Sequence, residues 1–371
     1  MSWWRGLLAA VLLGAVVVVF TDDGPLSQGR GGDRTSSSSG GSEADGGGAA
    51  GGDGGGPPEG AEREGMRYVE PTGEEGSGSI DDPHGTLEEG LEAVRAGEVL
   101  WVAGGDYEER IDVKVRPGTA QQPIVVRALP GERPVVRGLL WLEKPSYWTI
   151  IGINVTWHRD NDADEHMVKL TGGSEWTFAE AELWDAESFA SLLVDGDASE
   201  FTLRDLFVHD TAEANGTNQD HLIYLNPGTG GGVVEHCLLV GSPNGRAIKV
   251  GPADEDGDEV AGIEIRYNTM LDNRGPSNVQ LAWDTSDVWI HHNIMVEPAE
   301  GRANVTAFQL AGDGNVVEDN IGYGTDLVTQ EDVDGLVDRD NRIFDPELEG
   351  EEQRPTDRRA IGYGHTAAPG E

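Results

Sequence analysis

The sequence predicts an all-β fold, a parallel β-solenoid in which short strands stack coil upon coil. Three observations lead to this prediction: a short apolar segment recurs seven times, a turn and a second apolar segment follow each copy, and apolar residues alternate within the copies. The copies are LLWL (139–142), MVKL (167–170), SLLV (191–194), LIYL (222–225), AIKV (247–250), NVQL (278–281) and AFQL (307–310). Their mean spacing is 28 residues, which is typical of a repeat architecture.

The pattern within each copy distinguishes strands from helices. The second and fourth positions are apolar in all seven copies, so they face a core while the third position faces outward. A helix would need apolar residues at i, i+3 and i+4 over ten or more positions, and the copies are too short for that. A propeller blade needs four strands in about 40–45 residues. We therefore expect coils of two strands each, stacked so that every coil buries its apolar row against the next.

Charge and cysteine content exclude several classes of protein. The chain carries 68 acidic and 26 basic residues, a formal charge of −42, and residues 66–371 alone carry −37. This excess of negative charge repels nucleic acid. Cys237 is the only cysteine, so no intramolecular disulfide can form. The acidic, lysine-poor composition suits a surface kept soluble in high salt or alkaline surroundings, and a compositional bias of the genome explains it equally well.

The first 21 residues have the pattern of an export segment. Residues 6–20 follow Arg5 and carry no charge. At about 1.5 Å per residue they reach only ~22 Å, short of a ~30 Å hydrocarbon core, which favours a cleaved signal peptide. The lack of a small-x-small cleavage site before Thr21 favours an uncleaved anchor instead. We expect residues 1–21 to be a signal peptide or membrane anchor, and the protein to be extracellular or on the cell surface.

Residues 22–65 have the composition of a linker. They are rich in glycine and serine and almost free of apolar residues, so they cannot offset the entropy lost on ordering. The folded part is then a single domain over residues 66–371, which we expect to be a monomer.

A short helix is predicted near the start of this domain. Thr86 and Glu89 have the spacing of a capping box, Leu87 and Leu91 share one helix face, and Gly97 supplies a stop. Such a helix would cover the open end of the solenoid, where strand edges are otherwise exposed.

Two stretches give the sequence a resemblance to a known family. YVEPTGEEGSGSIDDPHGTLEEGLEAVRAGEVLWVAGGDYEE (68–109) resembles the opening strand, capping helix and first coil of right-handed parallel β-helix proteins related to pectate lyases and other polysaccharide lyases. IFDPELEGEEQRPTDRRAIGYGH (343–365) resembles the extended tail that ends many of these proteins. The resemblance implies a right-handed parallel β-helix over residues 68–365. It leaves the reaction open, because this solenoid hosts lyases, hydrolases, epimerases and adhesins.

The outward third positions of the seven copies form a column of side chains. Equivalent positions on adjacent coils lie ~4.8 Å apart, and the column reads Trp141, Lys169, Leu193, Tyr224, Lys249, Gln280 and Gln309. Aromatic rings stack on sugars, lysine binds carboxylates and amides bond hydroxyls. We therefore predict that an acidic polysaccharide is bound by Trp141, Lys169, Gln280 and Gln309. The alternative is a solvated face on which lysine merely offsets negative charge.

The middle of this column carries the candidate catalytic residues, which are Asp220, His221, Tyr224, Arg246 and Lys249. β-Elimination across a uronic acid needs a cation on the carboxylate, a base for the C5 proton and an acid for the leaving oxygen. Lys249 beside Arg246 would have a lowered pKa and act as the base. Arg246 or His221 would bind the carboxylate, and Tyr224 would supply the proton. The alternative is structural, with His221 and Asp220 bonded to backbone at a corner. Some β-helix lyases pair a lysine base with an arginine in a similar way.

Two other functions stay open. A glycoside hydrolase of the polygalacturonase type would use Asp220 with Asp195 as its two carboxyl groups, and residues 218–220 and 246–249 resemble fragments of that family's signature. A non-catalytic surface module would bind glycan without changing its length.

Two acid-rich turns, residues 160–165 and 254–259, place oxygen ligands at alternate positions, as Ca²⁺ prefers, but neither fits the twelve-residue EF-hand loop. We expect solvated loops there and assign no metal ligands, with Ca²⁺ the one cofactor left open.

Overall fold

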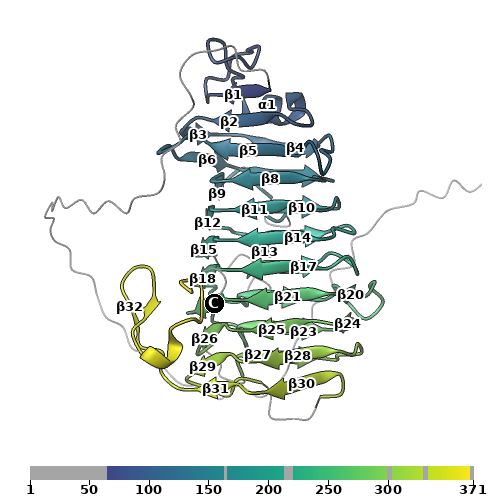
Figure 1. Ribbon diagram of the computed structural model, residues 1–371, viewed down its shortest axis with the longest axis vertical. Helices are drawn as coiled ribbons and strands as arrows, with labels where there is room; N and C mark the ends of the chain where they lie inside the picture. Colours follow the sequence, from purple (N-terminus) through teal and green to yellow (C-terminus); the bar gives the residue numbers. More distant parts are fainter. Residues whose placement is uncertain (1–64, 163–164, 213–219, 299–302, 329–332, 368–371) are drawn as a thin grey trace, which may run out of the picture. The chain divides into compact units, whose positions relative to one another are not determined.

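The computed structural model describes residues 65–162, 165–212, 220–298, 303–328 and 333–367. Three parallel β-sheets run through this part of the chain, and successive strands pass from one sheet to the next, so that three strands make one coil (Figure 1). The fold is a parallel β-helix of the right-handed type, as predicted. The predicted signal or anchor segment and all but the last residue of the predicted linker lie outside the described residues. Within the described ranges, no helix has the length and apolar character needed to span a bilayer.

The three sheets contain eight, eleven and ten strands. The eight-stranded sheet consists of β4 (Arg110–Lys114), β7 (Leu139–Glu143), β10 (Val168–Thr171), β13 (Ala190–Asp195), β16 (His221–Asn226), β19 (Ile248–Val250), β23 (Val279–Ala282) and β27 (Val305–Phe308). The eleven-stranded sheet consists of β1 (Met66–Val69), β2 (Val99–Val102), β5 (Ile124–Ala128), β8 (Trp148–Ile151), β11 (Thr177–Ala179), β14 (Phe201–Arg204), β17 (Gly232–Glu235), β21 (Ile263–Arg266), β25 (Trp289–His291), β28 (Asn315–Glu318) and β30 (Leu336–Arg339). The ten-stranded sheet consists of β3 (Gly105–Tyr107), β6 (Pro134–Arg137), β9 (Asn154–Thr156), β12 (Glu182–Trp184), β15 (Phe207–His209), β18 (Leu238–Val240), β22 (Thr269–Leu271), β26 (Ile294–Val296), β29 (Ile321–Tyr323) and β31 (Arg342–Ile343). Two short pairs complete the described part, β20 (Val260–Ala261) with β24 (Thr285–Ser286) and β32 (Leu348–Glu349) with β33 (Arg354–Pro355).

The expectation of two strands per coil is wrong, because the second apolar segment of each coil breaks into two strands. In WTIIGINVTW (148–157) the break falls between β8 and β9, where Gly152 has a φ of 71°. Asp205 and Tyr267 hold the equivalent corner in later coils, with φ of 52° and 53°. A residue in this left-handed region ends the extended run and turns the chain into the third sheet.

The predicted inward positions form the core in six of the seven copies. The second and fourth positions from Leu140 to Leu281 are all buried and belong to one continuous apolar cluster. In the seventh copy the prediction is wrong. Val305 and Ala307 pair with the inward Val279 and Leu281, whereas the alternation places residues 308 and 310 inward. Asn278 and Asn304 are the residues directly before β23 and β27. The Nδ2 of Asn278 donates to Oδ1 of Asn304 (2.8 Å), and this buried amide pair supports the observed register of the two strands.

A column of four buried or half-buried asparagines stabilises the corner before the ten-stranded sheet in the C-terminal coils. We call Asn268, Asn293, Asn320 and Asn341 the asparagine column. The Oδ1 of Asn293 accepts from the backbone N and the Nδ2 of Asn268 (2.9 and 3.0 Å), and the same two bonds recur from Asn293 to Asn320 (both 3.0 Å). Each Nδ2 also reaches backbone carbonyls, so the buried amides are fully hydrogen-bonded.

The predicted helix is present as α1 (Leu87–Ala93), beside β1 at the N-terminal end of the stack (Figure 1). The Oγ1 of Thr86 accepts from the backbone N of Glu89 (3.2 Å), which is one half of the predicted capping box. The carboxylate of Glu109 from the first coil accepts from the backbone N of both Leu87 and Glu88. The helix ends before Val94, so Gly97 does not stop it.

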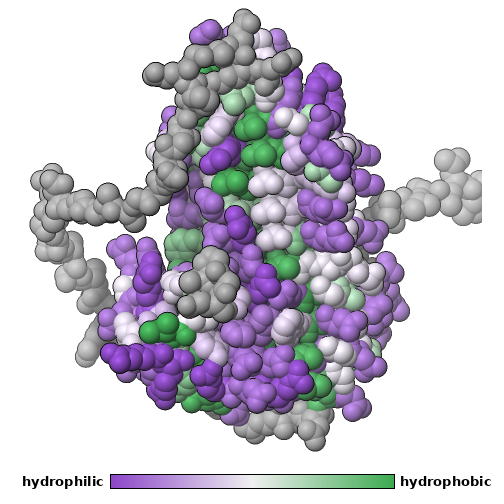
Figure 2. All heavy atoms as spheres, viewed as in Figure 1, coloured by the Kyte–Doolittle hydropathy of each residue, from purple (hydrophilic) through white to green (hydrophobic). Residues whose placement is uncertain are grey.

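The C-terminal segment after β31 folds back on the ten-stranded sheet (Figure 1, yellow). Phe344, Ala360 and Tyr363 pack with Ile294 and Ile321 in a small apolar cluster that covers this end of the sheet. The rest of the face shown in Figure 2 is mainly hydrophilic, with a broken strip of apolar residues along the stack.

Candidate functional site

The outward column lies on the eight-stranded sheet, and strand register places its members on successive coils. Lys169 pairs with Trp141 and Leu193, Tyr224 pairs with Leu193 and Lys249, and Lys249 pairs with Gln280. The prediction that Gln309 is the last member of the column is wrong, because Gln280 pairs with Thr306. Gln309 lies beyond the end of β27 with a φ of 47°, off the column.

Three further side chains surround Tyr224, and each stands three residues ahead of a column residue: His166 ahead of Lys169, His221 ahead of Tyr224 and Arg246 ahead of Lys249. Each is followed by two consecutive core residues, Met167 and Val168, Leu222 and Ile223, and Ala247 and Ile248. Two successive inward residues break the strand alternation, so the side chain before them falls on the outer side.

Tyr224 is the centre of this arrangement, which we call the tyrosine cluster: His166, His221, Tyr224, Arg246 and Lys249. The rings of both histidines have their centroids 6.3 Å from the Tyr224 ring. The Lys249 Nζ lies 4.3 Å from the same ring centroid, in the geometry of a cation–π contact. Strand β16 carries His221 and Tyr224, β19 carries Lys249, and His166 and Arg246 lie two residues before β10 and β19. Together they bring one tyrosine, two histidines and two cationic side chains to one place.

Lys249 has the electrostatic surroundings of a general base. Burial disfavours its charged form, and the nearby Arg246 guanidinium repels it, so its pKa falls to about 8 against the weaker opposing effect of Asp254. The Nζ donates to the backbone carbonyl of Pro252 (3.2 Å), which fixes the amine beside the Tyr224 ring. Near neutral pH a useful fraction of Lys249 is therefore uncharged and able to accept a proton.

Arg246 stays charged throughout the physiological pH range, and His221 is neutral. Arg246 is only 4% exposed, and its Nε donates to the Oγ of Ser277 (3.2 Å). The backbone N of Arg246 donates to Nδ1 of His221 (3.2 Å), so the ring proton of His221 is on Nε2. Burial, together with the charges of Arg246 and Lys249, holds the pKa of His221 well below its usual value. Of the two residues predicted to bind a carboxylate, Arg246 is therefore the one that carries charge.

Two buried polar atoms of the cluster have no hydrogen-bond partner among the described residues: Oη of Tyr224 and Nδ1 of His166. Burial raises the pKa of Tyr224, so its phenol keeps its proton. Burial and the charge of Lys169 lower the pKa of His166 to about 4, so this histidine is neutral. The sequence interpretation missed His166, although its position three residues before a column lysine matches the spacing of Arg246 and Lys249.

Asp220 and Asp195 lie at opposite ends of neighbouring strands. Asp220 precedes β16 and is fully buried, with its carbonyl oxygen accepting from the Oγ of Ser242 (2.6 Å). Asp195 ends β13, where it pairs with Asn226 at the far end of β16 and accepts from its Nδ2 (3.1 Å). Six residues of strand at about 3.3 Å each put the two carboxyl groups roughly 15–20 Å apart. Glycoside hydrolysis needs them within about 10 Å.

The N-terminal part of the column has its own cation and aromatic ring. The Lys169 Nζ lies 3.1 Å from the ring centroid of Trp141, and the Trp141 Nε1 donates to Oγ1 of Thr171 (2.9 Å). Burial lowers the pKa of Lys169. Lys169, Arg246 and Lys249 thus put three cationic side chains on one sheet face of a strongly acidic domain.

The acid-rich turns use several of their carboxylates within the protein. The Asp254 side chain accepts from the backbone N of Asp256 (3.1 Å), Glu259 accepts from Ser286, and Glu165 pairs with Arg110. In the parts of the chain that the structure describes, no three His, Cys, Asp or Glu side chains are grouped so as to hold a metal ion. Residues 163–164 of the first turn lie outside those parts.

Comparison with known proteins gives similarities to polysaccharide lyases. No family model matches the sequence. Over 118 residues, 31% of this chain and 27% of the other, the sequence is 26% identical to pectate lyase PEL9 of Emericella nidulans. The solved pectate lyase Pel9A aligns with 82% of this chain and 81% of its own, at 14% identity and a TM-score of 0.49. An alginate lyase from Paenibacillus aligns with 69% of this chain and 96% of its own, at 14% identity and a TM-score of 0.43.

Proposed function

We propose that the protein is an enzyme that cleaves an acidic polysaccharide by β-elimination on the outer face of the eight-stranded sheet. The observation that carries the proposal is Lys249, a half-buried amine with a pKa of about 8 beside Arg246 and over the Tyr224 ring. The sequence similarity to a pectate lyase over 118 residues supports the same class of substrate. The export-like segment at residues 6–20 supports action outside the cell.

The residues of the cluster divide the reaction between them. Arg246 binds the uronate carboxylate and stabilises the charge that develops there. The neutral Nζ of Lys249 takes the C5 proton, the C5–H electrons form the C4–C5 double bond, and the C4–O bond breaks. The phenol of Tyr224 gives its proton to the leaving oxygen. Transfer of the extra proton from Lys249 to the tyrosinate, directly or through solvent, restores the starting state.

The neutral histidines orient the substrate in this scheme. His166 Nδ1 and Tyr224 Oη are buried atoms without a described partner, and a sugar hydroxyl or the glycosidic oxygen would satisfy them. Lys169 over Trp141 provides a second binding position along the column, and Gln280 follows Lys249 on the other side. The polysaccharide would then lie along the stack of coils.

The test is incubation of the purified protein with pectate, alginate and chondroitin, with and without Ca²⁺, in low and high salt. Ultraviolet absorbance of the unsaturated product and new reducing ends are followed together. A rise in both on one polymer is the expected result. New ends without absorbance would replace elimination with hydrolysis, and binding without either signal would make the protein a glycan-binding module.

A further inference from the structure

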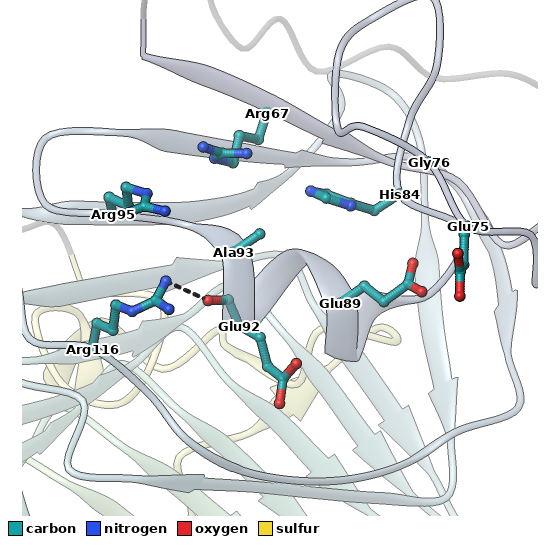
Figure 3. Close-up of a pocket in the computed structure, with 9 residues that line it drawn as sticks. All are labelled: Arg67, Glu75, Gly76, His84, Glu89, Glu92, Ala93, Arg95 and Arg116. Carbon is teal, nitrogen blue, oxygen red and sulfur yellow. Dashed lines mark hydrogen bonds between the residues drawn. The ribbon is translucent and has the colours of Figure 1, made fainter.

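A cavity of about 440 Å³ lies at the N-terminal end of the stack, beside α1. Its walls come from β1, the loop before α1, the helix itself and the turns after α1 and β4 (Figure 3). At least four coils, about 20 Å at ~4.8 Å per coil, separate this end from Tyr224. The cavity is therefore distinct from the tyrosine cluster.

Three arginines gather on one side of the cavity, which is unusual in a domain with a net charge of −37 (Figure 3). Arg67 is held by the carboxylate of Glu98 through two bonds (2.7 and 3.3 Å). Arg116 donates to the backbone carbonyl of Glu92 (2.7 Å). The exposed guanidinium of Arg95 makes no hydrogen bond or ion pair with the described part of the chain, so it is available to a ligand.

Two residues that line the opposite side of the cavity, His84 and Glu89, carry buried hydrogen-bonding atoms that the described part of the chain does not satisfy. His84 is 7% exposed, and its buried Nε2 has no hydrogen-bond partner among the described residues. The buried Oε2 of Glu89 likewise has none, because this side chain does not return to Thr86 as a complete capping box would. Glu75 lies on the same side (Figure 3). A buried carboxylate oxygen without a donor is costly, so a donor from a bound ligand or a water molecule would stabilise it.

We propose that this cavity binds a small polyhydroxylated carboxylate, such as a monomeric or dimeric uronate. Arg95, with Arg67 and Arg116 beside it, binds the carboxylate, and hydroxyl groups of the ligand donate to Glu89 and His84. A simple carboxylate would leave the Glu89 oxygen unsatisfied, and a neutral sugar would leave Arg95 unpaired. The volume falls in the range of about 300–1,000 Å³ typical of small-molecule sites. Only the choice of uronate as the ligand rests on the proposed function.

The test is calorimetric titration of the whole protein with galacturonate, with galactose and acetate as partial ligands. We expect one galacturonate per chain at the cavity, and binding of galactose and acetate that is weaker by roughly tenfold or more. Arg95→Ala should weaken galacturonate binding about tenfold, and Arg95→Lys should restore part of it. Arg159→Ala is the matched control, because Arg159 is an exposed arginine elsewhere on the chain, and it should change nothing.

Lys249→Ala separates this site from the tyrosine cluster. Galacturonate binding that is unchanged in Lys249→Ala and about tenfold weaker in Arg95→Ala supports the cavity site, even if no polymer is cleaved. Binding that is lost in Lys249→Ala and kept in Arg95→Ala would place the ligand in the cluster, which overturns the cavity site and leaves the proposed function standing. Absence of galacturonate binding, or equal binding of galactose, would also overturn it.

Discussion

The asparagine column and the tyrosine cluster are both stacks of buried polar side chains, and they differ in whether their hydrogen bonds are complete. Asn293 donates to two backbone carbonyls and to Asn320, and accepts twice from Asn268. In the cluster, Tyr224 Oη and His166 Nδ1 have no described partner, and Lys249 has a pKa lowered by burial. Buried polar groups normally find partners inside the protein. The complete column therefore stabilises the fold, whereas the incomplete cluster costs stability and is suited to a ligand.

The largest expected effect follows removal of the Lys249 amine. Lys249→Met should lower turnover of a cleaved polymer by about 10²–10⁴-fold, because the general base is lost. The same change should raise the free energy of unfolding at pH 7 by about 3 kcal/mol, because the folded state holds the charged amine at a depressed pKa. This cost is fully present below pH 8 and disappears as the pH rises toward the ordinary lysine value of 10.5.

Lys114→Met is the matched control for that change, since Lys114 is exposed at the end of β4. It should alter neither turnover nor the free energy of unfolding, both measured under the same conditions. A Lys249→Met protein that is less stable than the parent would show that the amine supports the fold.

The next effect is on the asparagine column. Asn293→Ala leaves several buried amide and carbonyl groups without partners and should lower the free energy of unfolding by about 3 kcal/mol in urea titrations. Asn341→Ala, at the half-buried end of the column, should cost only about 1 kcal/mol. Equal losses at the two positions would mean that burial does not determine how much the column's hydrogen bonds contribute to the free energy of unfolding.

Two tyrosines sharpen the comparison directly. Tyr107 Oη donates to the backbone carbonyl of Ala103 (2.8 Å), whereas Tyr224 Oη has no described partner. Tyr107→Phe should therefore lower the free energy of unfolding by about 1 kcal/mol, and Tyr224→Phe should leave it unchanged or raise it. Turnover should fall about 10²-fold in Tyr224→Phe alone. A loss of stability in Tyr224→Phe matching that in Tyr107→Phe would remove the distinction between satisfied and unsatisfied phenols.

The smallest effect concerns the remote binding position. Lys169→Ala should raise KM by roughly three- to tenfold and leave kcat unchanged, because Lys169 contacts substrate away from the bond that breaks. Steady-state kinetics on a polymer and on a short oligomer test this expectation. A fall in kcat at unchanged KM would place Lys169 among the groups that act in the transition state.

Most of the fold follows from the sequence because alternation and spacing are local signals. The inward rows of six copies and six members of the outward column were predicted correctly. The third strand of each coil was missed, because corners held by Asp205 or Tyr267 interrupt an apolar segment without a glycine or proline to mark the break. The prediction for the last coil failed because apolar residues at 305, 307, 308 and 310 allow two registers, and the sequence pattern does not show that Asn278 bonds to Asn304.

The site was predictable only in part. The column residues Tyr224 and Lys249 share a regular position, whereas His166 and Arg246 lie where two successive core residues break the alternation. The cavity beside α1 joins segments far apart in the chain, and no sequence pattern marks it. The alternative in which Asp195 and Asp220 act together was not supported. Their neighbouring coils are close, but the two residues lie at opposite ends of their strands, which coil spacing does not reveal.

The most direct test of Lys249 as general base is the pH dependence of kcat/KM on the polymer that the protein cleaves. Since the neutral amine is the active form, kcat/KM should rise about tenfold per pH unit below the pKa and level off above about 8. Lys249→Met should abolish this rise and leave only residual activity. A profile with its maximum near pH 4–5 would indicate catalytic carboxyl groups and contradict the assignment of Lys249.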